Sequence, residues 1–206
     1  MSEISAKDVA ALRKETGAGM MDAKRALQEA GGDAARAKEI LREQGIADAS
    51  KRSGRSTEHG TIGHYLHIQA DRPVIGVLVE LASETDFVAK SADFQAAARD
   101  LAMHVAAARP TWVQREDVPA ETLEHEKKLF AAQARNEGKP EQVIDRIVEG
   151  KLSAFYKDNV LYDQTFVNPE RFDGTVGEMI TAMIATMGEN ISVRRFVRVG
   201  VGESEA

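Results

Sequence analysis

The chain has 206 residues, enough for one medium-sized domain and a small second one, and its formal net charge is −6. This acidic balance argues against a general nucleic-acid-binding protein, which is usually basic. Because the chain has no cysteine, disulfides, thiolate catalysis and cysteine-ligated zinc are excluded. No segment approaches the roughly 18 consecutive apolar residues of a membrane span, and the chain does not begin like a signal peptide. We therefore expect a cytoplasmic protein that does not associate with membranes.

Three short helices are predicted at the N-terminal end. Ser5 opens the first with a capping-box-like pattern, and the glycine loop Gly17–Gly19 ends it. A second helix is expected over residues 20–30. Asp33 caps a third helix, which Gly45 is expected to end. Helices this short, joined by tight glycine loops, should pack as a compact bundle.

After this bundle, the spacing of apolar residues changes from the helical pattern to alternation, with a period of two residues. Apolar residues alternate over 61–70, continue over 74–81 after a turn, and alternate again over 191–199, which predicts three strands of one antiparallel sheet. Helices are predicted over 92–108 and 176–187, where they would cover one face of that sheet. The fold class is therefore α+β.

A helical hairpin is predicted as an insertion in this sheet-containing part, over about 119–158. Pro119 opens the first helix, which ends near Gly138, and Pro140 opens the second, which is expected to reach Gly150; a third helical piece then runs on to about Asp158. The expected domains are a three-helix domain over 1–46, a linker over 47–58 that is rich in Lys, Arg and Ser, and an α+β domain over 59–206.

Neither the glycine loop nor the histidine cluster indicates a ligand site. The loop 17–19 and Lys24 lie between two helices, whereas a phosphate-binding loop follows a strand and ends in Gly-Lys-Ser/Thr. His59, His64 and His67 form the one histidine cluster. On a strand, His64 and His67 point to opposite faces, which is poor geometry for one metal ion. We expect no metal and no cofactor.

The sequence offers no catalytic residue either. Glu80, Glu84 and Asp86 are close in sequence, but no nucleophile accompanies them, and ordinary surface acids are the simpler interpretation. No serine lies in a Gly-x-Ser-x-Gly elbow. His104 falls in an apolar helix, where a packed histidine is expected. The chain is therefore not expected to be an enzyme.

Exposed apolar side chains are better candidates for function. Met20 and Met21 open a helix after a glycine loop, and a small bundle cannot bury both, so at least one should be exposed. Thr85 and Asp86 are capping residues at the corner between strand and helix, which places Phe87 on a connection. Phe87 either folds back beneath this loop or stays exposed as a contact.

Four segments resemble the elongation factor Ts family, the guanine-nucleotide exchange factors of bacterial translation. They are ETDFVA (residues 84–89), LRKETGAGMMDAKRAL (12–27), MHVAA (103–107) and VEGKL (148–152), of which the first two together are highly specific. Their order along the chain is the order in the family. The resemblance implies a ubiquitin-associated-like topology for the N-terminal bundle.

The resemblance also implies a partner and a set of contacts. The partner is elongation factor Tu, a GTPase, with GDP bound. Thr85, Asp86, Phe87 and Val88 match the segment that reaches the magnesium region, with Phe87 inserted between helices of the GTPase. Arg13, Met20 and Met21 match positions that contact the nucleotide-binding domain of the GTPase. The match of His67 is weaker and is to a position that contacts a neighbouring domain of the GTPase.

Longer family members carry two core subdomains, whereas this sequence indicates one. A homodimer held without disulfides would supply two copies. Two alternatives remain open at this point. The first is a module whose helical bundle binds ubiquitin-like or nascent-chain partners, in which changes at Met20 matter and Phe87→Ala is silent. The second is an enzyme that uses the strand from His59 to His67.

Overall fold

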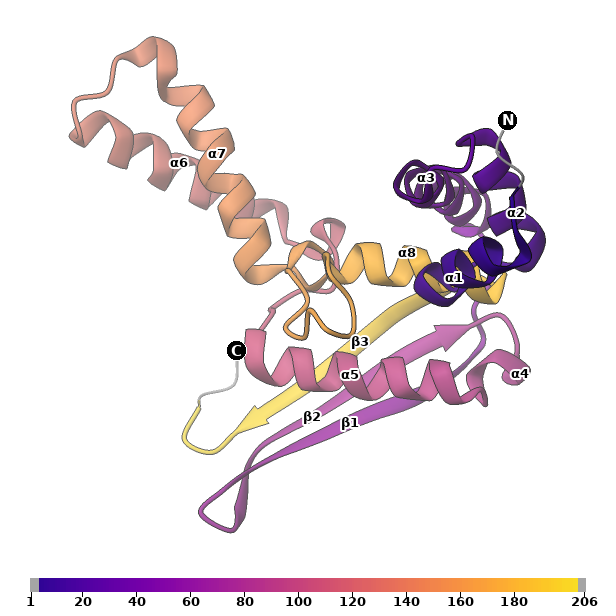
Figure 1. Ribbon diagram of the computed structural model, residues 1–206. Coiled ribbons are helices and arrows are strands. Elements are labelled where there is room, and N and C mark those ends of the chain that lie inside the picture. The colour runs from indigo at the N-terminus through magenta and orange to yellow at the C-terminus, as the bar shows by residue number, and fades with distance from the viewer. Residues whose placement is uncertain (1–3, 204–206) are drawn as a thin grey trace. The chain divides into compact units, whose positions relative to one another are not determined.

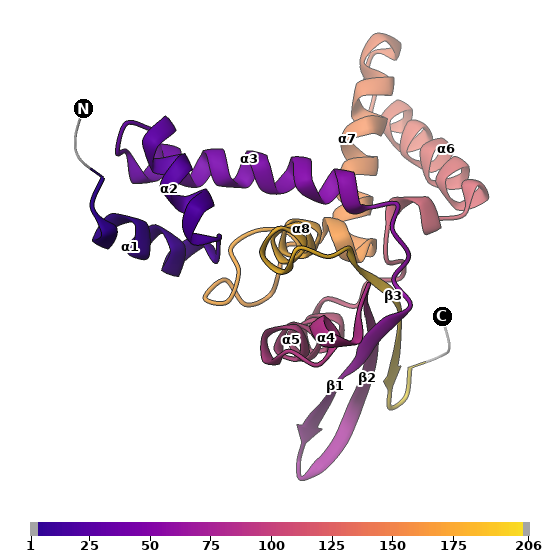
Figure 2. The same ribbon diagram turned by 90° about the vertical axis from the view of Figure 1, so that its right-hand side faces the viewer.

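The computed structural model describes residues 4–203 and divides the chain into two compact units (Figures 1 and 2). The first unit contains residues up to 60, 82–91 and 179–192; the second contains 61–81, 92–178 and the residues from 193 onward. The α-helices are α1 (Ala6–Thr16), α2 (Met20–Glu29), α3 (Ala34–Arg52), α4 (Asp86–Ala89), α5 (Ala92–Ala108), α6 (Ala120–Asn136), α7 (Glu141–Asn159) and α8 (Val176–Met187). The strands are β1 (His59–Gln69), β2 (Arg72–Ser83) and β3 (Ile191–Gly200), and the 3-10 helices are Arg115–Asp117 and Leu161–Asp163.

Helices α1, α2 and α3 of the first unit pack around one small apolar core. Ser5 caps α1 with a complete capping box, and Asp33 caps α3 by accepting hydrogen bonds from two backbone N–H groups. Gly17, at φ +69°, ends α1 in the left-handed conformation. The core consists of Val9, Leu12, Ala23, Ala26, Leu27, Ala37 and Ile40. The helices begin and end as predicted up to this point, and the ubiquitin-associated topology stays a prediction.

Gly45 does not end the third helix, so that prediction was wrong. Helix α3 continues through Gly45 to Arg52, and Gly45 is buried inside it. A Cβ added at Gly45 would lie 3.2 Å from the Cβ of Ala185 in α8, so glycine here allows two helices of the first unit to approach closely. Residues 47–52 of the predicted linker are therefore helical, and the domain boundaries themselves stay a prediction.

The sheet follows the predicted pattern, with strand order β1-β2-β3. The arrows in Figure 1 show β2 running opposite to both of its neighbours. Ala70 and Asp71, both at positive φ, form the tight connection between β1 and β2, as expected for a two-residue hairpin turn. The α+β class and the three-stranded antiparallel sheet are thus confirmed.

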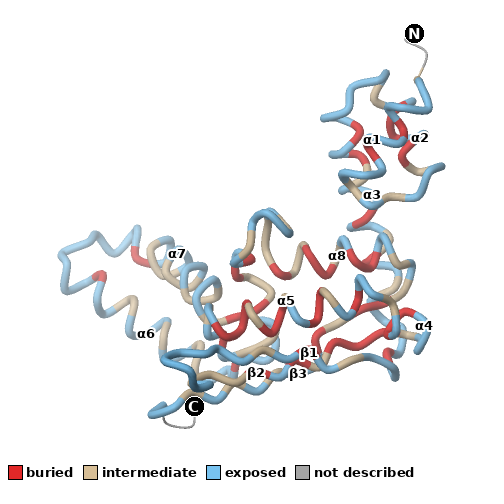
Figure 3. Tube along the Cα trace, turned by 60° about the horizontal axis from the view of Figure 1, so that its bottom comes forward, coloured by how far each residue is buried: buried red, intermediate tan, exposed pale blue. Residues whose placement is uncertain are grey.

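Helix α5 packs against one face of the sheet. Gly63 of β1 touches the backbone of Ala98, and a Cβ at Gly63 would lie 2.0 Å from the Ala98 carbonyl oxygen. Buried positions recur along α5 (Figure 3), and Phe94, Leu101 and Val105 are fully buried. The predicted bounds of α5 and α8 agree with the structure. The placement of α8 on the sheet stays a prediction, because most of α8 belongs to the first unit.

Gly63→Ala is expected to lower the free energy of unfolding by about 2–3 kcal/mol, because its methyl group must displace the backbone of α5. Gly150→Ala is the matched control. Gly150 lies inside α7 with nothing within 4 Å of an added Cβ, so this change should stabilise the protein by about 0.5–1 kcal/mol. Urea denaturation of both variants measures the difference. Equal effects of the two substitutions would contradict the close contact of β1 with α5.

Helices α6 and α7 form the predicted hairpin (Figure 1). The expected end of the second helix at Gly150 was wrong: α7 continues through Gly150 to Asn159, because one glycine inside a helix costs only about 1 kcal/mol. Gly138, at φ +73°, lies in the turn between the two helices, and Pro140 precedes the first residue of α7. Ala134 of α6 and Ile144 of α7 are buried near this turn, and Arg135 pairs with Glu141 across it. The hairpin is therefore held by a narrow apolar seam and a surface ion pair.

His104 is fully buried in the second unit, as expected for a packed histidine. Its Nε2 lies 3.0 Å from the amide oxygen of Gln164, and its Nδ1 accepts a hydrogen bond from the Val167 N–H at 3.2 Å. The ring stacks on Phe166. Because Nδ1 accepts a hydrogen bond, the ring is neutral and carries its proton on Nε2, where it donates to Gln164. Burial lowers the pKa of His104, and the hydrogen bond with Gln164 opposes this effect in part.

The buried histidine should make stability depend on pH. The unfolded chain takes up a proton near the ordinary histidine pKa of about 6.5, whereas the folded chain resists protonation to a lower pH. The contribution of neutral His104 is therefore complete above about pH 6.5 and falls below it, by at most about 1.4 kcal/mol per pH unit. Urea denaturation between pH 7.5 and 5.5 should show the advantage of the unmodified protein over His104→Gln shrinking as pH falls. A constant difference would contradict this assignment.

Candidate partner-binding surface

The segment after β2 forms a single helical turn, α4, in the first unit. Thr85 is its N-cap, with extended backbone angles, and its Oγ1 accepts a hydrogen bond from the Val88 N–H at 3.4 Å. Phe87 thus lies inside a short helix, whereas the sequence predicted an irregular connection. This difference in secondary structure does not alter the expectation that Phe87 lies at the surface, because a capped surface turn can expose a side chain as a loop does.

Side chains of this turn point in two directions. Phe87 is 82% exposed, and Asp86 and Thr85 are also exposed. Val88 and Ala89 are each 7% exposed. Val88 and Ala89 therefore anchor the turn while Phe87 projects into solvent. Of the two alternatives for Phe87, the structure shows the exposed one.

The acid next to Phe87 is held as a carboxylate. Lys90, one helical turn further on, pairs with Asp86. The hydrogen bond from Lys90 and then its positive charge lower the pKa of Asp86. At neutral pH the turn consequently presents the Asp86–Lys90 ion pair beside an exposed aromatic ring.

Glu84 is a structural carboxylate, whereas the sequence suggested an ordinary surface acid. It accepts a hydrogen bond from the backbone N–H of Asn190 at 2.6 Å and lies 3.4 Å from the guanidinium of Arg55. Asn190, 7% exposed, donates its side-chain amide to the backbone carbonyl of Arg55 at 2.8 Å. Three separate segments of the first unit meet here, at the base of the Phe87 turn.

The N-terminal candidates lie on α1 and at the start of α2. Met20 is 60% exposed and Met21 is 65% exposed. The sequence predicted at least one exposed methionine, and both are exposed. Arg13 is exposed on α1, and its carbonyl accepts the N–H of Gly17 at 2.8 Å. A Cβ at Gly17 would lie 3.4 Å from Thr186 Oγ1, so the loop before Met20 contacts the end of α8.

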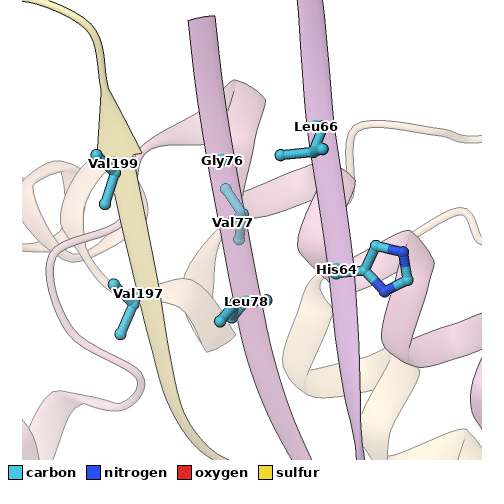
Figure 4. A pocket seen from close by; sticks show the side chains of 7 residues that line it. All are labelled: His64, Leu66, Gly76, Val77, Leu78, Val197 and Val199. Atoms are coloured by element: carbon cyan, nitrogen blue, oxygen red, sulfur yellow. The ribbon is translucent and has the colours of Figure 1, made fainter. Parts of the chain in front are cut away.

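His67 belongs to the second unit and is not grouped with these residues. It is exposed on β1, and its Nδ1 lies 3.4 Å from the hydroxyl of Tyr65. His64 lies on the opposite face of the strand beside Leu66 (Figure 4), as the alternation predicted. Within residues 4–203, no three His, Asp or Glu side chains gather in a group that could hold a metal ion.

The sheet face opposite α5 is apolar and exposed. Leu66 packs across Gly76 toward the centre of this face, and Leu78, Val197 and Val199 extend it over β2 and β3 (Figure 4). These residues are between 53% and 66% exposed. The apolar face, as it is called below, comprises Ile62, Leu66, Ile68, Leu78, Val197 and Val199. No helix in the described part of the chain is long and apolar enough to span a membrane.

Comparison with known sequences identifies the family. The family model described as "Elongation factor TS" matches residues 35–172. The chain belongs to the elongation factor Ts family. Elongation factor Ts of Thermosipho melanesiensis is 52% identical over 97% of this chain and 100% of its own length. The proteins of the same name from Fervidobacterium nodosum and Desulforamulus reducens are 51% and 50% identical over 98% of this chain, covering 100% and 91% of their own lengths.

The elongation factor Ts assignment covers both groups of candidate residues. The Phe87 turn lies inside the matched range, and the relatives' near-complete coverage extends to the N-terminal helices. Sequence reasoning missed Glu189 and Asn190, which support the Phe87 turn from the connection between α8 and β3. Their sequence context, a polar pair directly after Gly188, does not indicate that they bind Thr85 and Glu84 about a hundred residues earlier in the chain.

Proposed function

We propose that this protein is the guanine-nucleotide exchange factor for elongation factor Tu, binding its GDP complex and accelerating GDP release during translation elongation. Membership of the elongation factor Ts family supports the partner. The observation that carries the mechanism is Phe87, 82% exposed on a capped turn whose Val88 and Ala89 are buried beneath it. In this proposal Phe87 enters between helices of the GTPase close to its magnesium and phosphate site.

The mechanism is a wedge acting on the phosphate end of the nucleotide. GDP is held largely through backbone donors, its phosphates and Mg²⁺, which is often the largest local charge in such a site. A ring that separates the helices framing the magnesium weakens these contacts without touching the base. Coupling between two ligands is reciprocal, so the factor weakens GDP binding as much as GDP weakens the factor. Burying an aromatic anchor provides about 2 kcal/mol toward this coupling.

The remaining candidates have supporting roles in the proposal. Thr85 and Asp86 present the ring, and Val88 acts from below the turn because its side chain is buried. Arg13, Met20 and Met21 would bind the nucleotide-binding domain, since flexible thioether side chains suit an adaptable contact. His67, exposed on β1, would contact another domain of the partner. No covalent bond is made or broken by this chain, so it acts as a binding protein.

Stopped-flow release of a fluorescent GDP analogue tests the function. Elongation factor Tu loaded with the analogue is mixed with excess GDP, with and without this protein. Acceleration that rises and saturates with factor concentration is the expected result. Unchanged release at micromolar factor would contradict the proposed exchange activity and leave a binding module as the better interpretation.

We also propose that the protein acts as a homodimer through the apolar face. Its six apolar side chains are more than half exposed and gather on one face of the sheet, and contiguous exposed apolar patches mark interaction sites. Two such sheets can pack face to face about 10 Å apart, and two-fold symmetry brings this patch against itself. The ion pair of Glu80 with Arg195 lies on the neighbouring strands β2 and β3 and would form part of a polar rim.

A further inference from the structure

The connection between α8 and β3 binds the residue that caps the Phe87 turn. Glu189 accepts two hydrogen bonds from Thr85: its Oε2 lies 3.0 Å from the Thr85 backbone N, and its Oε1 lies 2.6 Å from Thr85 Oγ1. Both residues belong to the first unit. One carboxylate therefore fixes both the backbone and the side-chain rotamer of Thr85, and hydrogen bonds to a charged acceptor are stronger than neutral ones.

Every polar group of Thr85 is engaged as a result. Its hydroxyl donates to Glu189 and, on its other side, accepts the Val88 N–H at 3.4 Å. Its carbonyl accepts the hydroxyl of Ser83 at 2.9 Å and the N–H of Ala89 at 3.3 Å. The backbone immediately before Asp86 and Phe87 is therefore held from both sides, which fixes the position from which the Phe87 side chain projects.

This support matters because α4 is only four residues long. A single helical turn does not form in water without external partners, since helix nucleation is unfavourable. Val88 and Ala89 hold the turn by burial from below and bond Thr85 from within the turn, whereas Glu189 holds Thr85 from a distant part of the chain. Asn190, next to Glu189, holds the base of the same turn through its bond to Glu84. Glu189 and Asn190 thus provide the external hydrogen bonds that a helix as short as α4 needs in order to form.

We infer that Glu189 is a positioning residue for nucleotide exchange: it holds Thr85 so that Phe87 is presented in the orientation that enters the GTPase. The inference rests on the proposed exchange function and adds a residue to it. Glu189 itself acts through Thr85 and contacts no nucleotide. Preorganising an anchor in this way removes an ordering cost that the complex would otherwise bear.

The test compares Glu189→Ala with Glu189→Gln by stopped-flow GDP release. The alanine variant should lower the maximal release rate about tenfold, as expected for losing two hydrogen bonds to a charged group. The factor concentration at half-maximal rate should change less, because the N-terminal contacts remain. The glutamine variant should recover most of the rate, since its amide oxygen can accept the Thr85 N–H while its amide nitrogen donates to Thr85 Oγ1.

Two further measurements separate positioning from general damage. Amide hydrogen exchange at residues 85–88 should become faster in Glu189→Ala, while exchange in α1 to α3 stays unchanged. Glu39→Ala, which removes another carboxylate of the first unit from its surface pair with Arg36, should alter neither rate nor exchange. Glu189→Ala should slow release less in a Thr85→Val background than in the unmodified protein, because that background already lacks the bond from Thr85 Oγ1 to Glu189.

The outcomes distinguish this inference from the proposed function. If the unmodified protein accelerates GDP release and Glu189→Ala does so equally, the positioning role is wrong. If the unmodified protein does not accelerate release, the proposed function fails, and hydrogen exchange at residues 85–88 still decides whether Glu189 orders the turn. Unchanged exchange there would overturn the inference.

Discussion

Phe87→Ala is expected to slow the maximal rate of factor-dependent GDP release from elongation factor Tu by about 30-fold, the equivalent of about 2 kcal/mol lost at a buried aromatic anchor. The folded protein should be almost unaffected, because a ring that is 82% exposed makes few contacts of its own. Stopped-flow release with the fluorescent analogue measures the rate. A thermal melt of the same sample should show an unchanged midpoint.

The matched control is Leu129→Ala. Leu129 is an exposed apolar residue of α6, 42% exposed, so its truncation also removes apolar surface but outside the Phe87 turn. It should leave the rate within about twofold, as is usual for residues that are not binding hot spots. If Phe87→Ala exchanges nucleotide as fast as the unmodified protein, the wedge is refuted, even if the factor still binds. A loss only in Met20 variants would favour the binding-module alternative.

Long elements with a strong hydrophobic period could be predicted from the sequence. The bounds of α5 and α8 follow from continuous helical spacing, and the hairpin of α6 and α7 follows from proline and glycine at its ends. In these segments local propensity and tertiary packing favour the same structure, so the local sequence pattern is enough to predict the element.

Gly45 shows where this agreement ends. Glycine is a common residue just after a helix, and read locally it predicts an end. In the structure it is a point of close contact, since Ala185 leaves little room for a side chain. Nothing near Gly45 in the sequence distinguishes these two roles, because the contact lies 140 residues further along the chain.

The candidate site also has a part that the local sequence predicts and a part that depends on the fold. The capping residues Thr85 and Asp86 predicted a strand-to-helix corner, and the structure has a capped helical turn there where an irregular connection was expected. The exposure of Phe87 could not be derived from the residues alone, because burial depends on what the rest of the chain places above the turn. Glu189 was beyond prediction for a similar reason. Its partner Thr85 is 104 positions away, and hydrogen bonds across that separation follow only from the fold.

Leu78→Asp is expected to dissociate the proposed homodimer. Leu78 is 53% exposed on β2, the central strand, at the middle of the apolar face, so the monomer can accommodate a carboxylate there without burying it. In a two-fold interface the substitution appears twice and buries two unpaired charges, which should raise the dissociation constant by at least about 1,000-fold. Light scattering at micromolar concentration should report twice the 22.5 kDa chain mass for the unmodified protein and the chain mass for Leu78→Asp.

Leu129→Asp on α6 is the control for the added charge, and it should remain dimeric because it lies outside the apolar face. A monomeric mass for the unmodified protein would refute the homodimer directly. The exchange assay then gives the dimer a functional meaning. If two copies of the sheet-containing part are needed on one GTPase, Leu78→Asp should lose exchange activity with the Phe87 turn intact. If one copy is enough, monomeric Leu78→Asp should exchange nucleotide at the normal rate, and the apolar face serves assembly alone.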